Sequence, residues 1–538
     1  MMAGPGSLYV TMQPEPGLPL EQFHEWYNNE HGPTRLKLPQ IFTNGLRYRA
    51  KDGQEPTFLA AYDVTVMSHL ETETYTSLRD NRSQREAETI GQVDVKRYFW
   101  DRVLSQQSPL FTPIEQLTDE EAEGLELVAV QLTPKEPDSS VEEIQKWYGE
   151  EHINLLSKVP GWLRSRLFKV SSLEKGVPTR FLALHDYAKN HGVGGPEYQA
   201  AISTPRTKEL YAKYGTMSSR RVYSLFYVFG AGSRDLHSLS RLPAAAAAFT
   251  SPDGVISTTN SPSPVIESRV AAPDGLPIPY RLEGNPDPAA PTIAFCNSLL
   301  TSLHMWDPFV AILVKQRPQY RVLRYDARGR HAASSPSTLP ILADELATLL
   351  SALRIPRLAA LVGVSMGGAT TLNFALTHPS KLEKLVACDF NASSSAANTA
   401  AWKDRIAVAE ADLPDGTPGI ARLAGQTVER WFHPATMRKG DTVAWIRDMV
   451  AANDVQGFRY GCQALWDYDL RPRLGGCAVP GLFVVGEGDG KGALVKAMEG
   501  FRGLVGAAGV ELAVVPETGH LPMCEDPEGF WKAVEGFL

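Results

Sequence analysis

The chain has 538 residues and a formal net charge of −8 at pH 7. This length exceeds what one hydrophobic core usually serves, so two or three domains are expected. Hydrophobic residues make up 43% and charged residues 21%, as in ordinary globular proteins, and the acidic balance excludes a basic nucleic-acid footprint. No apolar run reaches the length of a membrane span, and the N-terminus lacks a basic region followed by an apolar one, so neither a membrane segment nor a secretory signal is expected.

The cysteines indicate a reducing compartment. There are five, all in the second half of the chain, and none has CxxC spacing. A cytoplasmic protein with buried thiols is therefore expected. No set of histidine, cysteine and carboxylate residues has metal-ligand spacing, so we expect neither a metal nor a cofactor.

The first 232 residues contain a repeat. The motif W-Y-x-x-E-H occurs at residues 26–31 and again 121 residues later, at 147–152. Each copy lies on an amphipathic helix after an apolar strand, and a basic strand, another strand, a second helix and a closing strand follow. The order β-α-β-β-α-β predicts a ferredoxin-like unit, and its recurrence predicts a duplication.

Over residues 7–105 and 125–232 these motifs resemble the EthD-like dimeric α+β barrel family. The resemblance implies that the two units pair sheet to sheet within one chain, and it allows a homo-oligomer through this barrel. It also implies that His31 and His152 line a cleft between helix and sheet. The residue pattern favours a different interpretation, in which each histidine packs on the sheet and hydrogen-bonds to a neighbour.

Residues 233–265 are dominated by Ala, Ser, Thr, Pro and Gly and show no apolar period. This composition predicts a mobile linker.

The stretch G-x-S-x-G at 363–367 lies between an apolar strand (357–362) and an apolar helix (369–376). A serine at such a sharp strand-to-helix turn stands alone at its tip, and only glycine neighbours fit around it. The pattern predicts that Ser365 is a catalytic nucleophile; the alternative is an ordinary strand–helix turn.

Strands and helices alternate over 266–538, which predicts a doubly wound α/β sheet, and a helical excursion over about 391–474 predicts a cap. A serine nucleophile of this kind takes its acid and base in the order Ser, Asp or Glu, His. Asp489 and His520 each follow an apolar strand, where ligands bind in open α/β sheets. They are the predicted acid and base, with Glu487 as the competing acid.

The motifs N-S-L (297–299), H-M-W-D-P (304–308), V-L-R-Y-D-x-R-G (322–329) and G-x-S-M-G-G (363–368) resemble the α/β-hydrolase fold, and more narrowly 3-oxoadipate enol-lactonases. After the fourth strand that family reads R-G-H-G-x-S, whereas residues 329–334 here read G-R-H-A-A-S. The resemblance implies an oxyanion hole formed by the backbone N–H groups of Leu299 and Met366.

The segment 457–471 resembles the enol-lactonase cap. Trp402, Trp431 and Trp466 are candidate walls of a substrate pocket, and Arg459 is a candidate partner for a substrate carboxylate. Each tryptophan could instead belong to the core of the cap, and Arg459 to a solvated face.

The leading hypothesis is a cofactor-free serine hydrolase that opens a lactone or ester of a small, enol-lactone-like molecule. A second hypothesis keeps the triad but assigns it to a carbon–carbon bond hydrolase or a tailoring esterase acting on aromatic or polyketide-like substrates. A third treats the N-terminal barrel as a ligand-binding or dimerisation module attached to a hydrolase scaffold.

Overall fold

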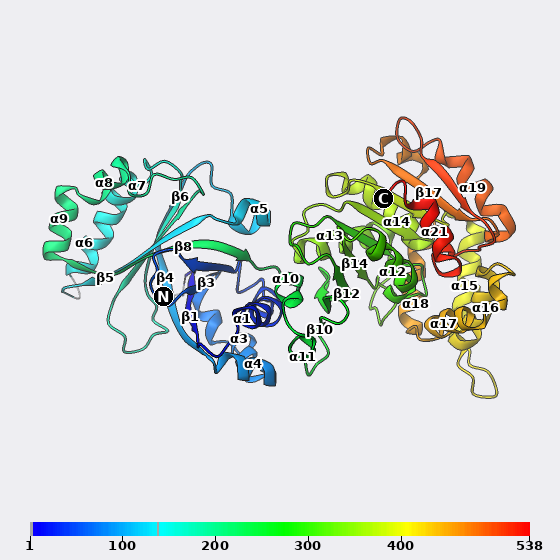
Figure 1. Cartoon of the computed structure of the whole chain (residues 1–538), viewed down its shortest axis with the longest axis horizontal. Coiled ribbons are helices and arrows are strands. Elements are labelled where there is room, and N and C mark those ends of the chain that lie inside the picture. The colour runs from blue at the N-terminus through cyan, green and yellow to red at the C-terminus, as the bar shows by residue number, and fades with distance from the viewer. Residues whose placement is uncertain (1–3, 137–138) are drawn as a thin grey trace. The chain divides into compact units, whose positions relative to one another are not determined.

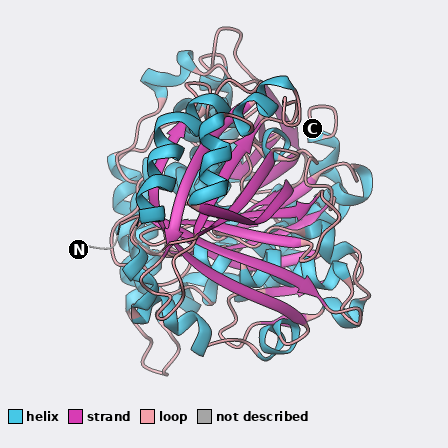
Figure 2. Ribbon diagram, turned by 90° about the vertical axis from the view of Figure 1, so that its left-hand side faces the viewer, coloured by secondary structure: helices cyan, strands magenta, loops and turns pink. Residues whose placement is uncertain are grey.

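The computed structural model describes residues 4–136 and 139–538. The chain divides into two compact units, one ending at Ser233 and the other beginning at Arg234 (Figure 1). Figure 2 distinguishes their strands, in magenta, from their helices, in cyan. No helix of the described residues is long and apolar enough to cross a membrane.

The first unit is a closed barrel of eight antiparallel strands in the order β1-β3-β2-β8-β5-β7-β6-β4. Pairing of β2 with β8 and of β4 with β6 joins the first half of the unit to the second, so the barrel closes within one chain. Its strands are β1 (Gly6–Pro14), β2 (Leu46–Ala50), β3 (Phe58–Val64), β4 (Val93–Gln107), β5 (Glu126–Pro134), β6 (Trp162–Val170), β7 (Phe181–Tyr187) and β8 (Gly215–Val228).

Helices lie against the outer face of this barrel (Figure 1). Each W-Y-x-x-E-H motif ends in a π-helical turn, Tyr27–His31 and Tyr148–His152. Such turns interrupt an α-helix locally and are frequent at functional sites. The helices are α1 (Leu20–Trp26), α2 (Pro33–Leu36), α3 (Glu73–Asp80), α4 (Gln84–Ile90), α5 (Asp119–Ala122), α6 (Ser139–Trp147), α7 (Ile153–Leu156), α8 (Pro196–Ile202) and α9 (Pro205–Lys213).

The second unit contains a ten-stranded sheet in the order β18-β17-β16-β15-β13-β14-β12-β11-β10-β9. The strands from β13 to β18 are parallel, and the other four are antiparallel. The parallel strands β13, β15 and β16 are buried at every position, as expected where helices cover both faces. The strands are β9 (Phe249–Thr250), β10 (Ser257–Thr259), β11 (Val265–Ala271), β12 (Pro277–Gly284), β13 (Thr292–Cys296), β14 (Arg321–Tyr325), β15 (Ala360–Val364), β16 (Leu385–Cys388), β17 (Gly481–Gly486) and β18 (Glu511–Val515).

Helices α15 to α18 form the predicted excursion between β16 and β17, and the others flank the sheet. Among the flanking helices, α13 packs on α14 and α12 packs on α21. The helices of the unit are α10 (Leu236–Ser240), α11 (Ala244–Ala247), α12 (Asp307–Gln316), α13 (Leu339–Ala352), α14 (Met366–Thr377), α15 (Ala396–Glu410), α16 (Gly419–Trp431), α17 (Gly440–Ala451), α18 (Val455–Gly461), α19 (Ala493–Arg502), α20 (Pro522–Glu525) and α21 (Pro527–Val534).

The prediction of a mobile linker over 233–265 needs correction. The segment forms α10 and α11, and β9 and β10 extend the sheet of the second unit. Leu236, Leu239 and Leu242 are buried in that unit's core. Three leucines at helical spacing bury enough apolar surface to order a short segment, a signal that the surrounding Ala, Ser and Pro residues masked.

Candidate active site

Ser365 lies at a tight turn between β15 and α14. Its backbone has φ 60° and ψ −118°, a region that side-chain-bearing residues rarely adopt. A Cβ atom on Gly363 would clash with the carbonyl oxygen of Gly367, and one on Gly367 would clash with the carbonyl oxygen of Cys296. Glycine at both positions therefore allows the turn that exposes the serine.

His520 and Asp489 meet at the carboxyl ends of the neighbouring strands. Asp489 follows β17, His520 follows β18, and His520 Nδ1 lies 2.7 Å from Asp489 Oδ2. Both side chains are largely buried, at 15% and 10% exposure. This geometry leaves His520 Nε2 for other chemistry, because Nδ1 is engaged by the carboxylate.

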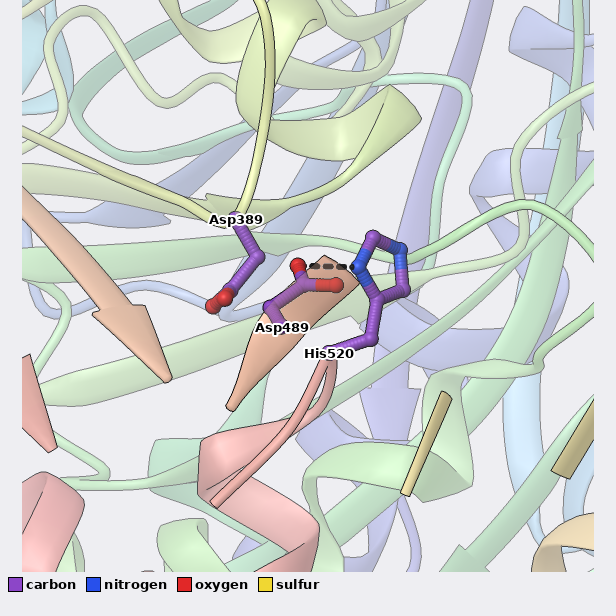
Figure 3. A group of neighbouring side chains, drawn as sticks. All are labelled: Asp389, Asp489 and His520. Atoms are coloured by element: carbon purple, nitrogen blue, oxygen red, sulfur yellow. Dashed lines mark hydrogen bonds and ion pairs between the residues drawn. The ribbon is translucent and has the colours of Figure 1, made fainter. Parts of the chain in front are cut away.

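A second carboxylic acid, Asp389, adjoins this pair. Figure 3 shows Asp489 between Asp389 and His520, and their side-chain ligand atoms all lie within 4.8 Å of one another. Asp389 Oδ1 accepts a 2.9 Å hydrogen bond from the Gly486 N–H. Burial, together with the neighbouring Asp489 carboxylate, holds the pKa of Asp389 well above its usual range. The raised pKa favours a proton on Asp389 beside the Asp489 carboxylate.

The loop that carries His520 is held by a buried glutamate. Glu525 Oε1 accepts hydrogen bonds from the N–H groups of Gly519, at 2.9 Å, and Leu521, at 3.2 Å. Its Oε2 accepts the His433 N–H at 3.0 Å. Glu525 thus fixes the residues on both sides of His520.

The two amides predicted for the oxyanion hole occupy suitable backbone positions. Met366 is the first residue of α14, so its N–H has no partner within the helix. Leu299 follows β13 and lines the same cavity as Ser365. In the described part of the chain, its N–H makes no backbone hydrogen bond.

Ser365, Asp489 and His520 open into one cavity of about 420 Å³ between the sheet and the helical excursion. Aromatic side chains from both sides form much of the wall: Phe390, Trp402, Trp431 and Tyr468. The volume is typical of small-molecule sites.

Residues 291–527 match the model of the alpha/beta hydrolase fold family. A 3-oxoadipate enol-lactonase of Acinetobacter baylyi is 31% identical over 253 residues, covering 46% of this chain and 89% of the relative. A putative carbamate hydrolase of Variovorax paradoxus is 26% identical over 275 residues, covering 49% of this chain and 96% of the relative. The solved enol-lactonase of Burkholderia xenovorans has 31% identity and a TM-score of 0.45, covering 50% of this chain and 98% of that one.

Through its C-terminal half, the chain belongs to the alpha/beta hydrolase family. The protein is a hydrolase, and its second unit is the hydrolase unit.

Two arginines on the cavity wall were missed by the sequence analysis. Arg405 on α15 and Arg430 on α16 both line the hydrolase cavity, and in the described structure neither forms an ion pair. Burial, followed by repulsion from Arg405, lowers the pKa of Arg430 to about 10, and burial also lowers the pKa of Arg405. Arg405 is half-buried, and Arg430 is exposed where it borders the cavity. Two neighbouring cations that form no ion pair favour an anionic ligand.

The structure corrects two predicted substrate contacts. Arg459 is 53% exposed and pairs with Glu410 at 3.2 Å, outside the cavity. Trp466 packs against the core, with the Lys403 ammonium 5.3 Å from its ring centroid, and does not line the cavity either. Both residues lie on the excursion, but on faces that point elsewhere.

The other predicted positions can be placed directly. Trp431 lines the cavity, and its ring lies 5.4 Å from that of His520. Glu487, the competing acid, is exposed and accepts the Glu517 N–H at 3.1 Å. Asp389 follows an apolar strand, as Asp489 does, so the reasoning that identified Asp489 from its position after a strand could also have identified Asp389. The helical pattern around Arg405 and Arg430 carries no comparable signal.

Proposed function

We propose that the hydrolase unit opens a lactone or ester through a Ser365–His520–Asp489 triad, and that its substrate carries a carboxylate. The names of the relatives support lactone or ester chemistry. The observation that carries the substrate class is the pair of arginines, Arg405 and Arg430, in the same cavity as Ser365.

In this mechanism Ser365 Oγ attacks the carbonyl carbon while His520 Nε2 takes the hydroxyl proton. The N–H groups of Met366 and Leu299 stabilise the oxyanion of the tetrahedral intermediate. The ring oxygen then leaves, and His520 returns the proton to the leaving group. Asp489 holds the imidazole in the required tautomer and stabilises its cationic form.

Water completes the reaction on the acyl-enzyme. His520 takes a proton from the water as its oxygen attacks the acyl carbon, and Ser365 leaves as the alcohol with that proton. When the leaving group is an enol, it ketonises after release, which makes ring opening of an enol-lactone effectively irreversible. This chemistry needs no group beyond the chain's own residues.

The first test is hydrolysis by wild type and Ser365→Ala of p-nitrophenyl acetate and of a muconolactone-type enol-lactone. We expect the substitution to reduce kcat on both substrates by a factor on the order of 10⁴ to 10⁶. Ser351→Ala, which removes an exposed serine on α13, is the matched control and should retain wild-type rates. Comparable rates for Ser365→Ala and wild type would refute the triad.

The aromatic wall favours one alternative substrate class. Phe390, Trp402, Trp431 and Tyr468 also suit an aromatic molecule, as expected for a carbon–carbon bond hydrolase or a tailoring esterase. Cleavage of the activated ester without opening of the enol-lactone would support this alternative.

We also infer that the N-terminal barrel arose by duplication of a ferredoxin-like, EthD-like unit. The repeated motif ends in a π-helical turn in both halves. In each half, a later helix begins at a hydroxyl N-cap, Ser83 in one and Thr204 in the other, that accepts the N–H three residues on.

A further inference from the structure

The second half of the barrel contains a cavity of about 390 Å³ between its helices and its sheet. It belongs to the first unit and shares no residue with the hydrolase cavity. Four aromatic side chains line it: Trp147, Tyr148, Tyr198 and Tyr211. Ile202 and Met217, which are 36% and 43% exposed, also line it and connect it to solvent. Rings on several sides of a small space favour a flat ligand.

Polar groups in this cavity have unused bonding capacity. His152 is 8% exposed, and its Nδ1 has no partner in the described structure. Burial lowers the pKa of His152 to about 4, so the ring is neutral at pH 7. A buried ring nitrogen without a partner is costly unless a ligand bonds to it.

A cation lies at the same cavity. Arg220 on β8 contacts the Tyr198 hydroxyl through Nε, at 3.3 Å, and Nη2, at 3.2 Å, and it lines the cavity. It forms no ion pair with a carboxylate of the described residues. The phenol of Tyr148 is held 2.9 Å from His185 Nε2, whose Nδ1 lies 2.7 Å from Ser165 Oγ.

The first repeat has charged side chains at the equivalent positions. The third residue after the helix N-cap is Glu86 there and Thr207 in the second repeat. Glu86 Oε1 lies 2.7 Å from His31 Nδ1, so this histidine has the partner that His152 lacks. Thr207 is shorter and instead accepts the Trp147 indole N–H at 3.2 Å.

The two repeats also differ at a second position near the motif histidine. The fourth residue after the helix histidine is Arg35 in the first repeat and Leu156 in the second. The Arg35 guanidinium lies 5.4 Å from the centroid of the Tyr62 ring and donates to the His31 carbonyl oxygen at 2.8 Å. Leu156 lines the open cavity without reaching across it. The first repeat thus pairs the Nδ1 of its motif histidine internally, whereas the second leaves Nδ1 of His152 open to a ligand.

We propose that the cavity of the second repeat binds a flat aromatic molecule that carries a carboxylate and a hydroxyl group. Arg220 pairs with the carboxylate, His152 Nδ1 accepts the hydroxyl hydrogen, and the surrounding rings stack on the flat body. This site is separate from the hydrolase cavity and does not depend on the proposed triad.

Isothermal titration calorimetry of the full chain with 6-hydroxy-2-naphthoate tests the proposal. Wild type should bind one molecule with a Kd below 1 mM, roughly −4 kcal/mol or better. Leu156→Arg/Thr207→Glu gives the second repeat the residues that close the first one and should weaken binding at least about 30-fold. Arg220→Gln removes the cation near the rim and should weaken binding about tenfold.

Arg97→Gln is the matched control. Arg97 pairs with Val10 across the first repeat, as Arg220 pairs with Val130 across the second, and its removal should leave the Kd unchanged. Circular dichroism and thermal unfolding check that each variant folds. No binding by wild type, or wild-type affinity in both the double variant and Arg220→Gln, overturns the proposal. Loss of binding in Arg430→Gln with retention in the double variant would place the probe in the hydrolase cavity and also overturn it.

Discussion

At the scale of single residues, the hydrolase cavity depends on three pairs of ionisable groups. His520 with Asp489 supplies the proposed base and its acid, Asp389 adjoins Asp489 with a raised pKa, and Arg405 with Arg430 provides positive charge that no ion pair neutralises. Each pair has a different consequence when one member is neutralised.

Asp489→Asn tests the identity of the acid. The amide can no longer stabilise a cationic imidazole and favours the wrong tautomer, so we expect kcat to fall on the order of 10³- to 10⁴-fold without loss of fold. Glu487→Gln is the control, because Glu487 is exposed and lies outside the cavity. The reverse pattern, with the larger loss in Glu487→Gln, would move the acid role to Glu487.

Arg430→Gln tests the substrate class. Loss of a charged hydrogen bond to a carboxylate costs about 1.5–3 kcal/mol. We therefore expect KM for a carboxylate-bearing lactone to rise about 10- to 100-fold, with little change in kcat and none in the hydrolysis of p-nitrophenyl acetate. Arg459→Gln, which removes an exposed arginine paired with Glu410, should behave as wild type. An equal rise in KM for the neutral ester would argue against an anionic substrate.

Asp389→Asn tests the raised pKa of Asp389. Because its native pKa is raised, the folded state retains a proton that the unfolded state releases above about pH 4. Stability therefore falls as the pH rises through this window, by about 1.4 kcal/mol per pH unit. Asparagine can still accept the Gly486 N–H and carries no charge, so the variant should lose this decline. Calorimetric unfolding of the hydrolase unit in the full chain between pH 5 and 8 measures how its stability changes with pH. An equal decline in wild type and Asp389→Asn would contradict a raised pKa of Asp389.

At the scale of elements, the helices of the barrel bury histidines against the sheet. Burial lowers the pKa of His24 to about 2, of His31 and His152 to about 4 and of His185 to about 3. All four are neutral when folded, whereas in the unfolded chain they take up protons near pH 6.5. At any pH between the lowered pKa values of the folded state and about 6.5, the folded barrel therefore binds fewer protons than the unfolded chain.

Acid should destabilise the barrel unit between about pH 6.5 and 4. Each such histidine lowers the unfolding free energy by about 1.4 kcal/mol per pH unit as the pH falls through this window. His24→Phe should reduce this loss, because both ring nitrogens of His24 are buried without partners and its neighbours include Phe23 and Phe58. Hydrogen exchange of the barrel amides at pH 7 and pH 5 measures the effect. An identical acid response in wild type and His24→Phe would be evidence against it.

At the scale of the whole molecule, the chain combines a closed barrel with a hydrolase unit. Each of the eight described barrel strands has a neighbour on both sides within the same chain, so none of them offers a free edge to a second copy. The expectation of a homo-oligomer through the barrel stays a prediction, and it requires a surface other than a strand edge. Sedimentation of the full chain would report the state directly.

Much of the hydrolase unit was predictable from local pattern alone. The elbow around Ser365 and the strand ends before Asp489 and His520 are short-range features, because a buried parallel strand and the turn after it are encoded within about ten residues. The repeat at 26–31 and 147–152 likewise predicted two similar β-α-β-β-α-β segments. The shared motif could not show that the two histidines differ in their partners, since Glu86, which contacts His31, lies 55 residues away from it in sequence.

The sequence by itself determined the family-defining turn, the order of strands and helices and the residues at the strand ends. Only the tertiary structure decided what faces the hydrolase cavity: Arg405 and Arg430 rather than Arg459, Trp431 rather than Trp466, and a second acid, Asp389, beside Asp489. The physical reason is that strand ends are brought together by the sheet itself. By contrast, which face of a cap helix lines the cavity depends on packing against residues distant in sequence, and the local hydrophobic periodicity does not indicate it.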